Sequence, residues 1–337
     1  MLKIHGGRMN KNAKIVDSML DLIGDIPLVR LNRIGKDAGA EILVKPEFLN
    51  PSGSIKDRIA KMMIEEAEKQ GHLKEGMTIV EGTTGNTGTA LAFVSAVKGY
   101  RFVAYTPTMV ANKSRMGIML AYGCETEAID IEAYNKKMGV SSEDDSSVHG
   151  GHVELLPRQI CLDLERENDD IWWARQFSSP QNVGAHHDWT AKEILEQTDG
   201  KLDAFVASVG TGGTILGVAR ALRAHNPDIM IIGVEPAGKA MMGAPEDYPL
   251  IEGISDGIIP EIFDSKLVDR VISITDQDAI EAAHAMAEQE GIFCGISSGA
   301  NVLASTMVAK ELGEGKRIVT VLPDNRDRYL EVEKYTT

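Results

Sequence analysis

The stretch that decides the fold runs Asn50-Pro51-Ser52-Gly53-Ser54-Ile55-Lys56-Asp57-Arg58. It places Lys56 behind a glycine-serine loop, in the first turn of a helix predicted to reach Gly71. Ser54 and Asp57 have the spacing of a capping box. The partial positive charge of a helix N-terminus lowers the proton affinity of an amine. Lys56 is therefore predicted to attack an aldehyde and anchor a cofactor covalently, the alternative being a solvated surface lysine.

Two further loops have the composition of anion sites. The first, Glu81-Gly82-Thr83-Thr84-Gly85-Asn86-Thr87-Gly88, joins a predicted strand at 77–80 to a predicted helix at 90–98. The second, Gly210-Thr211-Gly212-Gly213-Thr214, follows an apolar run at 204–209 and precedes a predicted helix. Ile215 stands where a dinucleotide fingerprint needs glycine, and the loop lacks the lysine of a P-loop. A single small phosphate suits it better.

A third loop of small residues, Cys294-Gly295-Ile296-Ser297-Ser298-Gly299-Ala300, leads into a helix predicted over 302–312. It supplies neutral hydroxyl groups, and Ser298 alone would be interpreted as a helix cap. The order of all four motifs along the chain carries more information than any one of them.

In that order the motifs resemble those of the cysteine synthase and cystathionine β-synthase family of fold-type II pyridoxal phosphate enzymes. Further matches over nearly the whole chain are Gly24-Asp25-Ile26-Pro27-Leu28-Val29-Arg30-Leu31, Gln176-Phe177 and Gly253-Ile254-Ser255-Asp256-Gly257-Ile258-Ile259-Pro260. The resemblance implies an α/β fold like that of tryptophan synthase β. Two α/β domains would each hold a mostly parallel twisted sheet, with the active site between them.

Apolar runs of strand length that alternate with helical stretches agree with this fold class. They lie at 41–44, 78–80, 102–105, 204–209, 230–234 and 317–321. By the family arrangement, residues 50–158 would form the small domain, and 13–49 with 159–337 the large cofactor-binding domain. Residues 1–12 would be a polar extension.

The resemblance also assigns roles to individual residues. Lys56 would carry pyridoxal 5′-phosphate, Asn86 would contact the ring oxygen of the cofactor, and Ser297 would face its pyridine nitrogen. The cofactor phosphate would bind to Gly210, Thr211, Gly212, Gly213 and Thr214. The substrate carboxylate would bind to Thr83, Thr84, Gly85, Thr87 and Gln176.

A serine opposite the pyridine nitrogen does not favour a protonated ring, so the cofactor would be a weaker electron sink. Expulsion of a β-substituent through an α-aminoacrylate would be favoured, with Lys56 as base and acid at the α-carbon. The predicted activity is β-replacement, with O-acetylserine or serine plus sulfide giving L-cysteine. One alternative is a cystathionine β-synthase-like, cysteine lyase or lanthionine-forming activity that releases hydrogen sulfide. Another is a non-catalytic homologue that binds an amino acid or a peptide tail.

Two departures from the family pattern concern Asp256 and the run before Tyr329. Asp256 stands where a small residue or a tyrosine is usual, so we predict a catalytic role for it. It would protonate a poor leaving group, act as base toward a thiol or bind a second ammonium group; the alternative is a turn cap facing water. Arg326 and Arg328 are expected to form ion pairs on a surface loop.

The chain has 337 residues, of which 43% are hydrophobic and 25% charged, with a formal net charge of −15. The negative charge argues against nucleic acid or an anionic membrane as a partner. Neither an apolar run of membrane-spanning length nor a signal-peptide pattern is present, so the cytoplasm is the expected compartment. We predict no metal site, because the three cysteines, Cys124, Cys161 and Cys294, are widely spaced and the histidines lie in loops without other ligands at a suitable spacing. The expected partners are an amino acid, sulfide or a thiol, and a second subunit in a homodimer.

Overall fold

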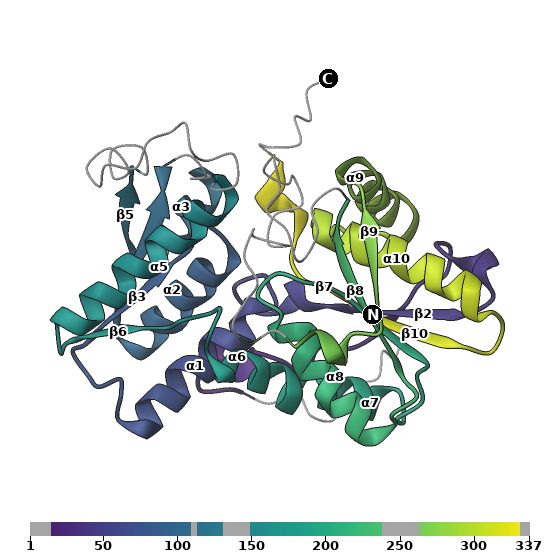
Figure 1. The fold of residues 1–337 in the computed structure, drawn as a ribbon, viewed down its shortest axis with the longest axis horizontal. Helices are drawn as coiled ribbons and strands as arrows, with labels where there is room; N and C mark the ends of the chain where they lie inside the picture. Colours follow the sequence, from purple (N-terminus) through teal and green to yellow (C-terminus); the bar gives the residue numbers. More distant parts are fainter. Residues whose placement is uncertain (1–14, 109–112, 131–148, 238–261, 263, 331–337) are drawn as a thin grey trace, which may run out of the picture.

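The computed structural model describes residues 15–108, 113–130, 149–237, 262 and 264–330. These residues form two lobes side by side, each built on its own β-sheet (Figure 1). Nearly all neighbouring strands pair in parallel, which confirms the predicted α/β class.

The larger sheet has the strand order β1-β2-β10-β7-β8-β9. β1 is antiparallel to β2, and the other neighbours are parallel. The strands are β1 (Val29–Arg30), β2 (Glu41–Pro46), β7 (Ala204–Ser208), β8 (Met230–Pro236), β9 (Arg270–Ile274) and β10 (Arg317–Leu322).

Helices cover both faces of this sheet, as a parallel sheet requires. Successive residues of β7 point to opposite faces: Phe205 packs in one apolar cluster with Leu216, and Val206 in another with Val308. The helices of this lobe are α7 (Ala191–Gln197), α8 (Gly213–His225), α9 (Asp276–Ala285) and α10 (Ile296–Leu312).

The smaller sheet has the order β5-β4-β3-β6, with all neighbours parallel. Its central strand β3 buries Ile79 against α1 and α2 on one face and Val80 near Cys161 of α5 on the other. The strands are β3 (Thr78–Gly82), β4 (Arg101–Pro107), β5 (Glu125–Ile129) and β6 (Ile171–Trp173). The helices are α1 (Lys56–Gln70), α2 (Asn86–Lys98), α3 (Lys113–Ala121), α5 (His149–Glu167) and α6 (Pro180–Ala185).

All six strands predicted from apolar runs are confirmed, as β2, β3, β4, β7, β8 and β10. Strands β1, β5, β6 and β9 were not predicted, because they are short or largely exposed. β6 at 171–173 belongs to the smaller sheet although it follows residue 158, where we placed the end of the small domain. The division into domains stays a prediction.

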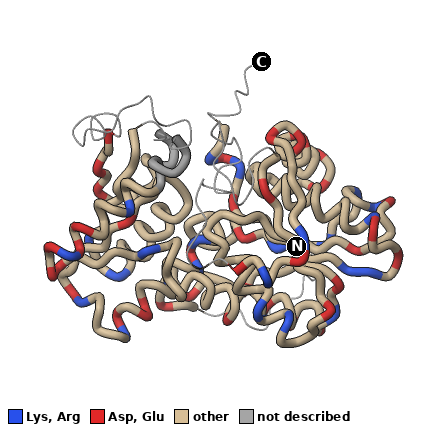
Figure 2. The backbone as a smooth tube through the Cα atoms, in the orientation of Figure 1, with Lys and Arg blue, Asp and Glu red and all other residues tan. Residues whose placement is uncertain are grey.

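Short helical turns connect the main elements. The 3-10 helices are η1 (Met19–Leu22), η2 (Lys36–Ala38), η3 (Glu47–Leu49), η6 (Ser265–Leu267) and η8 (Arg326–Tyr329), and the π-helical segments are η5 (His186–Thr190) and η7 (Met286–Glu290). Within the part of the chain that the structure describes, every helix is too short or too polar to cross a bilayer. Acidic and basic residues are interspersed over both lobes (Figure 2).

A cluster of four buried charges joins α1 to the larger lobe. The Arg58 guanidinium, which is inaccessible to solvent, pairs with Glu47 (Nε to Oε2, 2.8 Å) and with Glu193 (Nη1 to Oε1, 2.6 Å). Buried Lys45 also bonds Glu193, at 2.7 Å. Glu193 further accepts the backbone N–H groups of Asp25 and Ile26. The cluster therefore holds the N-terminal segment, β2, the start of α1 and α7 together.

Replacing Arg58 by methionine is expected to destabilise the protein by about 3–5 kcal/mol, because Glu47 and Glu193 would remain buried without their guanidinium partner. Urea unfolding followed by circular dichroism measures the change. The matched control is Arg101→Met, which removes an ion pair to Glu125 whose side chains are 58% and 52% exposed. The control should cost less than about 1 kcal/mol. Equal losses in the two variants would contradict the importance of the cluster.

Candidate active site

One pocket lies where β7 and β10 end, at the carboxyl edge of the larger sheet. The N-terminal residues of four helices meet there: Lys56 of α1, Asn86 of α2, the loop before α8, and Ser297 of α10. The lining residues are Ile55, Lys56, Asn86, Ser208, Gly210, Thr211, Gly212, Thr214, Ser297, Val321, Pro323 and Asp324. Motifs widely separated in the sequence thus form a single site.

Lys56 begins α1, as predicted, and the helix ends at Gln70 with Gly71 in the left-handed conformation. The predicted capping box between Ser54 and Asp57 is wrong. The Asp57 carboxylate instead accepts the backbone N–H of Ser52 at 2.7 Å and the Ser52 hydroxyl. Burial raises the pKa of Asp57 to about 6, although the Ser52 hydrogen bonds oppose this shift. The Asp57–Ser52 contact closes the loop in front of Lys56.

The Gly210–Thr214 loop turns at Gly212, whose φ of +82° suits glycine, and α8 starts at Gly213. A Cβ atom at Gly213 would lie 1.9 Å from Oδ1 of Asn182, so that position admits only glycine. Asn182 Nδ2 donates to Thr211 Oγ1 at 3.0 Å and to the Gln176 carbonyl at 2.7 Å. The sequence analysis missed Asn182, which supports the loop from α6.

His186 supports the same loop from beneath. Its Nε2 lies 3.2 Å from the Thr214 hydroxyl, and its Nδ1 lies 3.0 Å from that of Thr190. Burial lowers the pKa of His186 well below its ordinary value, and the positive charges of Lys56 and Arg58 lower it further. The imidazole is therefore neutral at physiological pH.

The other predicted anion loop, of which Thr83–Thr87 is part, lies directly before and around Asn86, and only Asn86 of this loop lines the pocket. The Thr87 hydroxyl donates to Gln176 Oε1 at 2.5 Å, so the structure brings together the two segments expected at the substrate carboxylate. Thr83 Oγ1 accepts the backbone N–H of Gly88 at 3.1 Å. Thr84 and Gly85 at the tip are partly exposed and accessible to a ligand.

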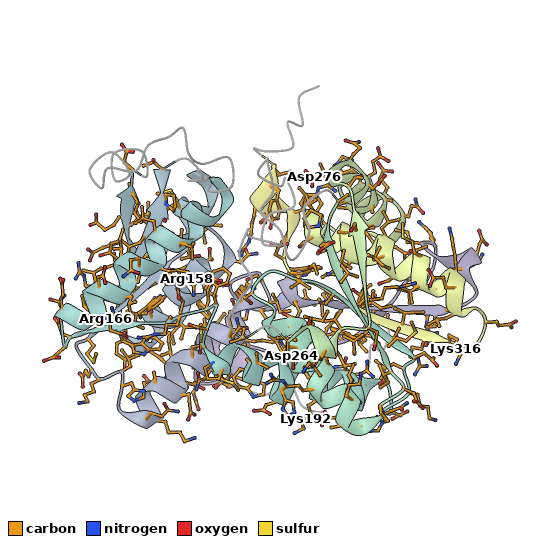
Figure 3. The ribbon with its side chains drawn as sticks, viewed as in Figure 1. Arg158, Arg166, Lys192, Asp264, Asp276 and Lys316 are labelled. Atoms are coloured by element: carbon orange, nitrogen blue, oxygen red, sulfur yellow. The ribbon has the colours of Figure 1, made fainter. Side chains whose placement is uncertain are left out.

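Glu81, fully buried in β3, holds β6 and the turn after it, which carries Gln176. Its carboxylate accepts Trp173 Nε1 and the backbone N–H groups of Gln176 and Gly82, each at 3.0 Å. Burial raises the pKa of Glu81 to about 7, although these hydrogen bonds and the positive charge of Arg158 oppose the shift. Arg158 lies on α5, where Figure 3 labels it.

Asn86 is held by two residues that the sequence analysis did not select. Its Nδ2 donates to Asp324 Oδ2 at 2.6 Å, and its Oδ1 accepts from the Arg328 guanidinium. Arg326 and Arg328 were expected to form ion pairs on the surface. This expectation is wrong, because the two arginines are only 1% and 4% exposed. The sequence analysis assigned neither Asp324 nor Arg328 to the site, and only the contact geometry reveals them.

Asp256 and the run 253–260 lie outside the described residues, as does the 1–12 extension. Cys124, Cys161 and Cys294 are all buried thiols in the structure. Among the residues that the structure describes, no group of three or more His, Cys, Asp or Glu side chains is arranged to hold a metal ion.

Comparison with known proteins adds direct evidence about the family. A sequence profile described as "Pyridoxal-phosphate dependent enzyme" matches residues 19–324. A cysteine synthase from Staphylococcus aureus (strain N315) is 38% identical over 325 residues, which cover 96% of this chain and 98% of that protein. A cystathionine beta-synthase from Oryctolagus cuniculus is 40% identical over 95% of this chain, which spans 56% of that longer protein.

Solved structures show the same relationship. The crystal structure of cysteine synthase from Entamoeba histolytica superposes with a TM-score of 0.84 at 37% identity, covering 99% of this chain and 94% of the other. A hydrogen sulfide-producing enzyme from Fusobacterium nucleatum superposes with a TM-score of 0.83 at 34% identity, covering 95% and 99%.

The raised pKa of Glu81 predicts a pH-dependent stability. Its ordinary value is 4.5 and its folded value about 7, so folding favours the protonated form. The stabilisation is complete below pH 4.5 and is lost as the pH rises to about 7, a total of about 3 kcal/mol from the shift. Between pH 5 and pH 8, urea unfolding should show a larger loss of stability in the wild type than in Glu81→Gln, in which Asp57, whose pKa is also raised, still titrates. Parallel pH profiles of the two proteins would contradict it.

Proposed function

This chain belongs to the family of pyridoxal-phosphate dependent enzymes, and we propose that it replaces the β-substituent of a serine-type amino acid. The simplest reaction of this kind adds sulfide to O-acetylserine or serine and gives L-cysteine. The proposal is supported by the cysteine synthase from Staphylococcus aureus, which matches over nearly the full length of both chains.

The chemistry of the donors in the pocket fits pyridoxal 5′-phosphate. Lys56 offers an amine for the aldehyde. The glycine-rich loop before α8 offers threonine hydroxyls and the backbone N–H groups of a helix N-terminus, which suit a phosphate. Ser297 offers a neutral hydroxyl for the ring nitrogen, and Asn86 an amide for the ring oxygen. These residues are the proposed cofactor site, Lys56, Asn86, Gly210, Thr211, Gly212, Gly213, Thr214 and Ser297.

When bound, pyridoxal phosphate supplies an aldehyde for amines and an electron sink for bonds broken at the α-carbon. The substrate amine first takes the place of Lys56 on the aldehyde, and the freed amine of Lys56 then takes the α-proton of the substrate. The bond between the β-carbon and its substituent then breaks, and the electron pair leaves with the substituent. Sulfide forms a new bond at the same β-carbon, and Lys56 returns the proton to the α-carbon.

The loop Thr83–Thr87 and Gln176 are proposed to bind the substrate carboxylate. Thr84 and Gly85 are accessible at the loop tip, which precedes α2, and backbone N–H groups at a helix N-terminus favour an anion. The hydrogen bond from Thr87 to Gln176 fixes the relative position of the two segments. The bound carboxylate would therefore orient the α-carbon toward Lys56.

The observation that carries the proposal is the meeting of Lys56, the Gly210–Thr214 loop and Ser297 in one pocket. An amine, a phosphate cradle and a neutral hydroxyl are the three groups that the sequence predicted for one cofactor, from segments far apart in the chain. If Lys56 were only a surface lysine, or Ser297 only a helix cap, there would be no reason for the three groups to lie in one pocket.

A second activity, release of hydrogen sulfide from cysteine, has support of its own. The Fusobacterium nucleatum structure is that of a hydrogen sulfide-producing enzyme. β-Elimination also needs the same removal of the α-proton by Lys56. Mass spectrometry of the products from serine, O-acetylserine or cysteine with sulfide, cysteine or homocysteine distinguishes the two activities. Cysteine consumed with sulfide release, without cysteine formation from O-acetylserine, would favour elimination.

We further propose a cytoplasmic homodimer, which fits the resemblance to the family. Sedimentation equilibrium of the purified protein measures the oligomer, and a monomer at micromolar concentration would contradict it.

Lys56→Ala is expected to abolish the visible absorption band that the wild type shows with pyridoxal phosphate, because the covalent bond to the amine is lost. Turnover should fall by about 10²–10⁴-fold or more, because loss of an acid–base group alone has an effect of this size. Absorbance titration and a cysteine assay measure both effects. The matched control, Lys69→Ala, removes an exposed lysine of the same helix and should behave as wild type. A wild type without the band would favour the non-catalytic binding homologue.

Asp256, the proposed second catalytic residue, is tested through donor preference. A carboxylate repels an anionic leaving group and is able to protonate a neutral one. O-phosphoserine should therefore be a poor donor, while serine and cysteine should serve as well as O-acetylserine. Spectra recorded with these four donors, in wild type and Asp256→Asn, give the ranking. An unchanged ranking in the variant would remove Asp256 from the mechanism.

A further inference from the structure

The segment after β10 contains several buried polar residues, of which Asp324 lines the pocket. Asp324, Arg328 and Tyr329 are 1%, 4% and 3% exposed. Asp324 lines the pocket, and its Oδ2 also accepts the Tyr329 hydroxyl. Burying a carboxylate and a guanidinium costs free energy unless both are hydrogen-bonded. The hydrogen-bond partners of Asp324 and Arg328 therefore indicate what these buried charges do in the pocket.

The hydrogen bonds of Asn86 define the orientation of its amide. Nδ2 donates to the Asp324 carboxylate at 2.6 Å, and Oδ1 accepts from Arg328. A carboxylate accepts hydrogen bonds only, and a guanidinium donates only. A flipped amide would set oxygen against carboxylate and NH₂ against guanidinium. The charges on both sides thus permit one orientation.

This orientation determines what Asn86 offers to a ligand. The NH₂ group has two hydrogens, of which one is used by Asp324, and Oδ1 is already occupied by Arg328. Asn86 therefore presents an N–H donor to the pocket that it lines. Such a donor suits an anionic oxygen of a bound ligand.

Arg328 also connects Asn86 to the loop in front of Lys56. Its Nη2 donates to the Ser52 carbonyl. A Cβ atom at Gly53, where φ is +87°, would lie 2.8 Å from that nitrogen, so the guanidinium packs on the glycine. One arginine thus sets the spacing between the loop of Lys56 and the amide of Asn86.

We propose that Asp324 and Arg328 are positioning residues that fix the Asn86 amide as a hydrogen-bond donor to the oxygen of the cofactor ring. The inference rests on the proposed function, since it needs pyridoxal phosphate in the pocket. It extends the site to the segment 324–329, which the sequence analysis did not assign to it.

A double-mutant cycle between Arg328→Gln and Asn86→Ala tests the coupling. The apoprotein is titrated with pyridoxal 5′-phosphate, and the affinity and the position of the visible band are recorded. Arg328→Gln should weaken binding about 10-fold, as expected for one charge-assisted hydrogen bond, and shift the band in the same direction as Asn86→Ala. In the Asn86→Ala background the same substitution should change affinity less than about 2-fold.

Milder variants keep the test valid if Arg328→Gln folds poorly. Arg328→Lys keeps the charge but not the two-nitrogen geometry, so it should give an intermediate shift. Tyr329→Phe removes only the hydroxyl that donates, together with Asn86 Nδ2, to Asp324 Oδ2. It should shift the band slightly, in the same direction as Arg328→Gln. The matched control is Arg326→Gln in the same 3-10 helix, where the guanidinium packs over the Phe293 ring at 5.9 Å. Its effect on affinity should be additive with Asn86→Ala and leave the band in place.

Two results would overturn the inference, and they are distinguishable. Additive losses for Arg328 and Asn86, with an unmoved band, would show a purely structural role while leaving the proposed function intact. A wild-type protein that forms no visible band with pyridoxal phosphate would contradict the proposed function and this inference together.

Discussion

The site depends on the pairing of Arg58 with Glu47 and Glu193. Burial alone would raise the pKa of Glu193, but Arg58 and Lys45 outweigh it and hold that pKa below its ordinary value. The carboxylate is therefore charged, and it stays charged only while both cations remain beside it. Arg58 stands two residues after Lys56 in the first turn of α1, so the geometry that satisfies the charges also fixes where the lysine emerges. Any rotation of the helix would break the hydrogen bonds of Arg58 to Glu47 and Glu193.

Apart from Lys56 and Asp324, the polar groups that line the pocket are neutral. His186 is kept neutral by burial and by the positive charges of Lys56 and Arg58. Ser297 is a hydroxyl at a helix N-terminus, where a carboxylate would also be favoured by the helix dipole. The phosphate loop contains no lysine, so backbone N–H groups and threonine hydroxyls supply its attraction for an anion. A cofactor bonded covalently to Lys56, as proposed, would need no stronger hold.

The loops of the site were predictable because their function constrains their own sequence. Gly212 needs a positive φ, and Gly213 has no space for a Cβ atom next to Asn182, so both constraints appear in the sequence as glycines. The buried strands were predictable for a related reason, because strands covered on both faces are continuously apolar. β5 was missed since most of its residues are exposed, and the capping box failed because Asp57 found a better donor in Ser52. The fold class and the loop positions thus follow from local composition, while the ends and caps of elements depend on tertiary contacts.

The supporting residues could not be predicted, because their signal lies in a partner far along the chain. Arg328 contacts Asn86 across 242 residues, and Asn182 reaches Thr211 from another element. In the sequence Arg328 stands among charged residues, which is also the composition of a solvated loop. Arg328 is buried because η8 packs against the loops at Ser52 and Asn86. This packing depends on how the two lobes meet, which the local sequence does not indicate. Local patterns therefore predict the groups that are proposed to touch a ligand, whereas the residues that hold these groups in position become visible only in the folded chain.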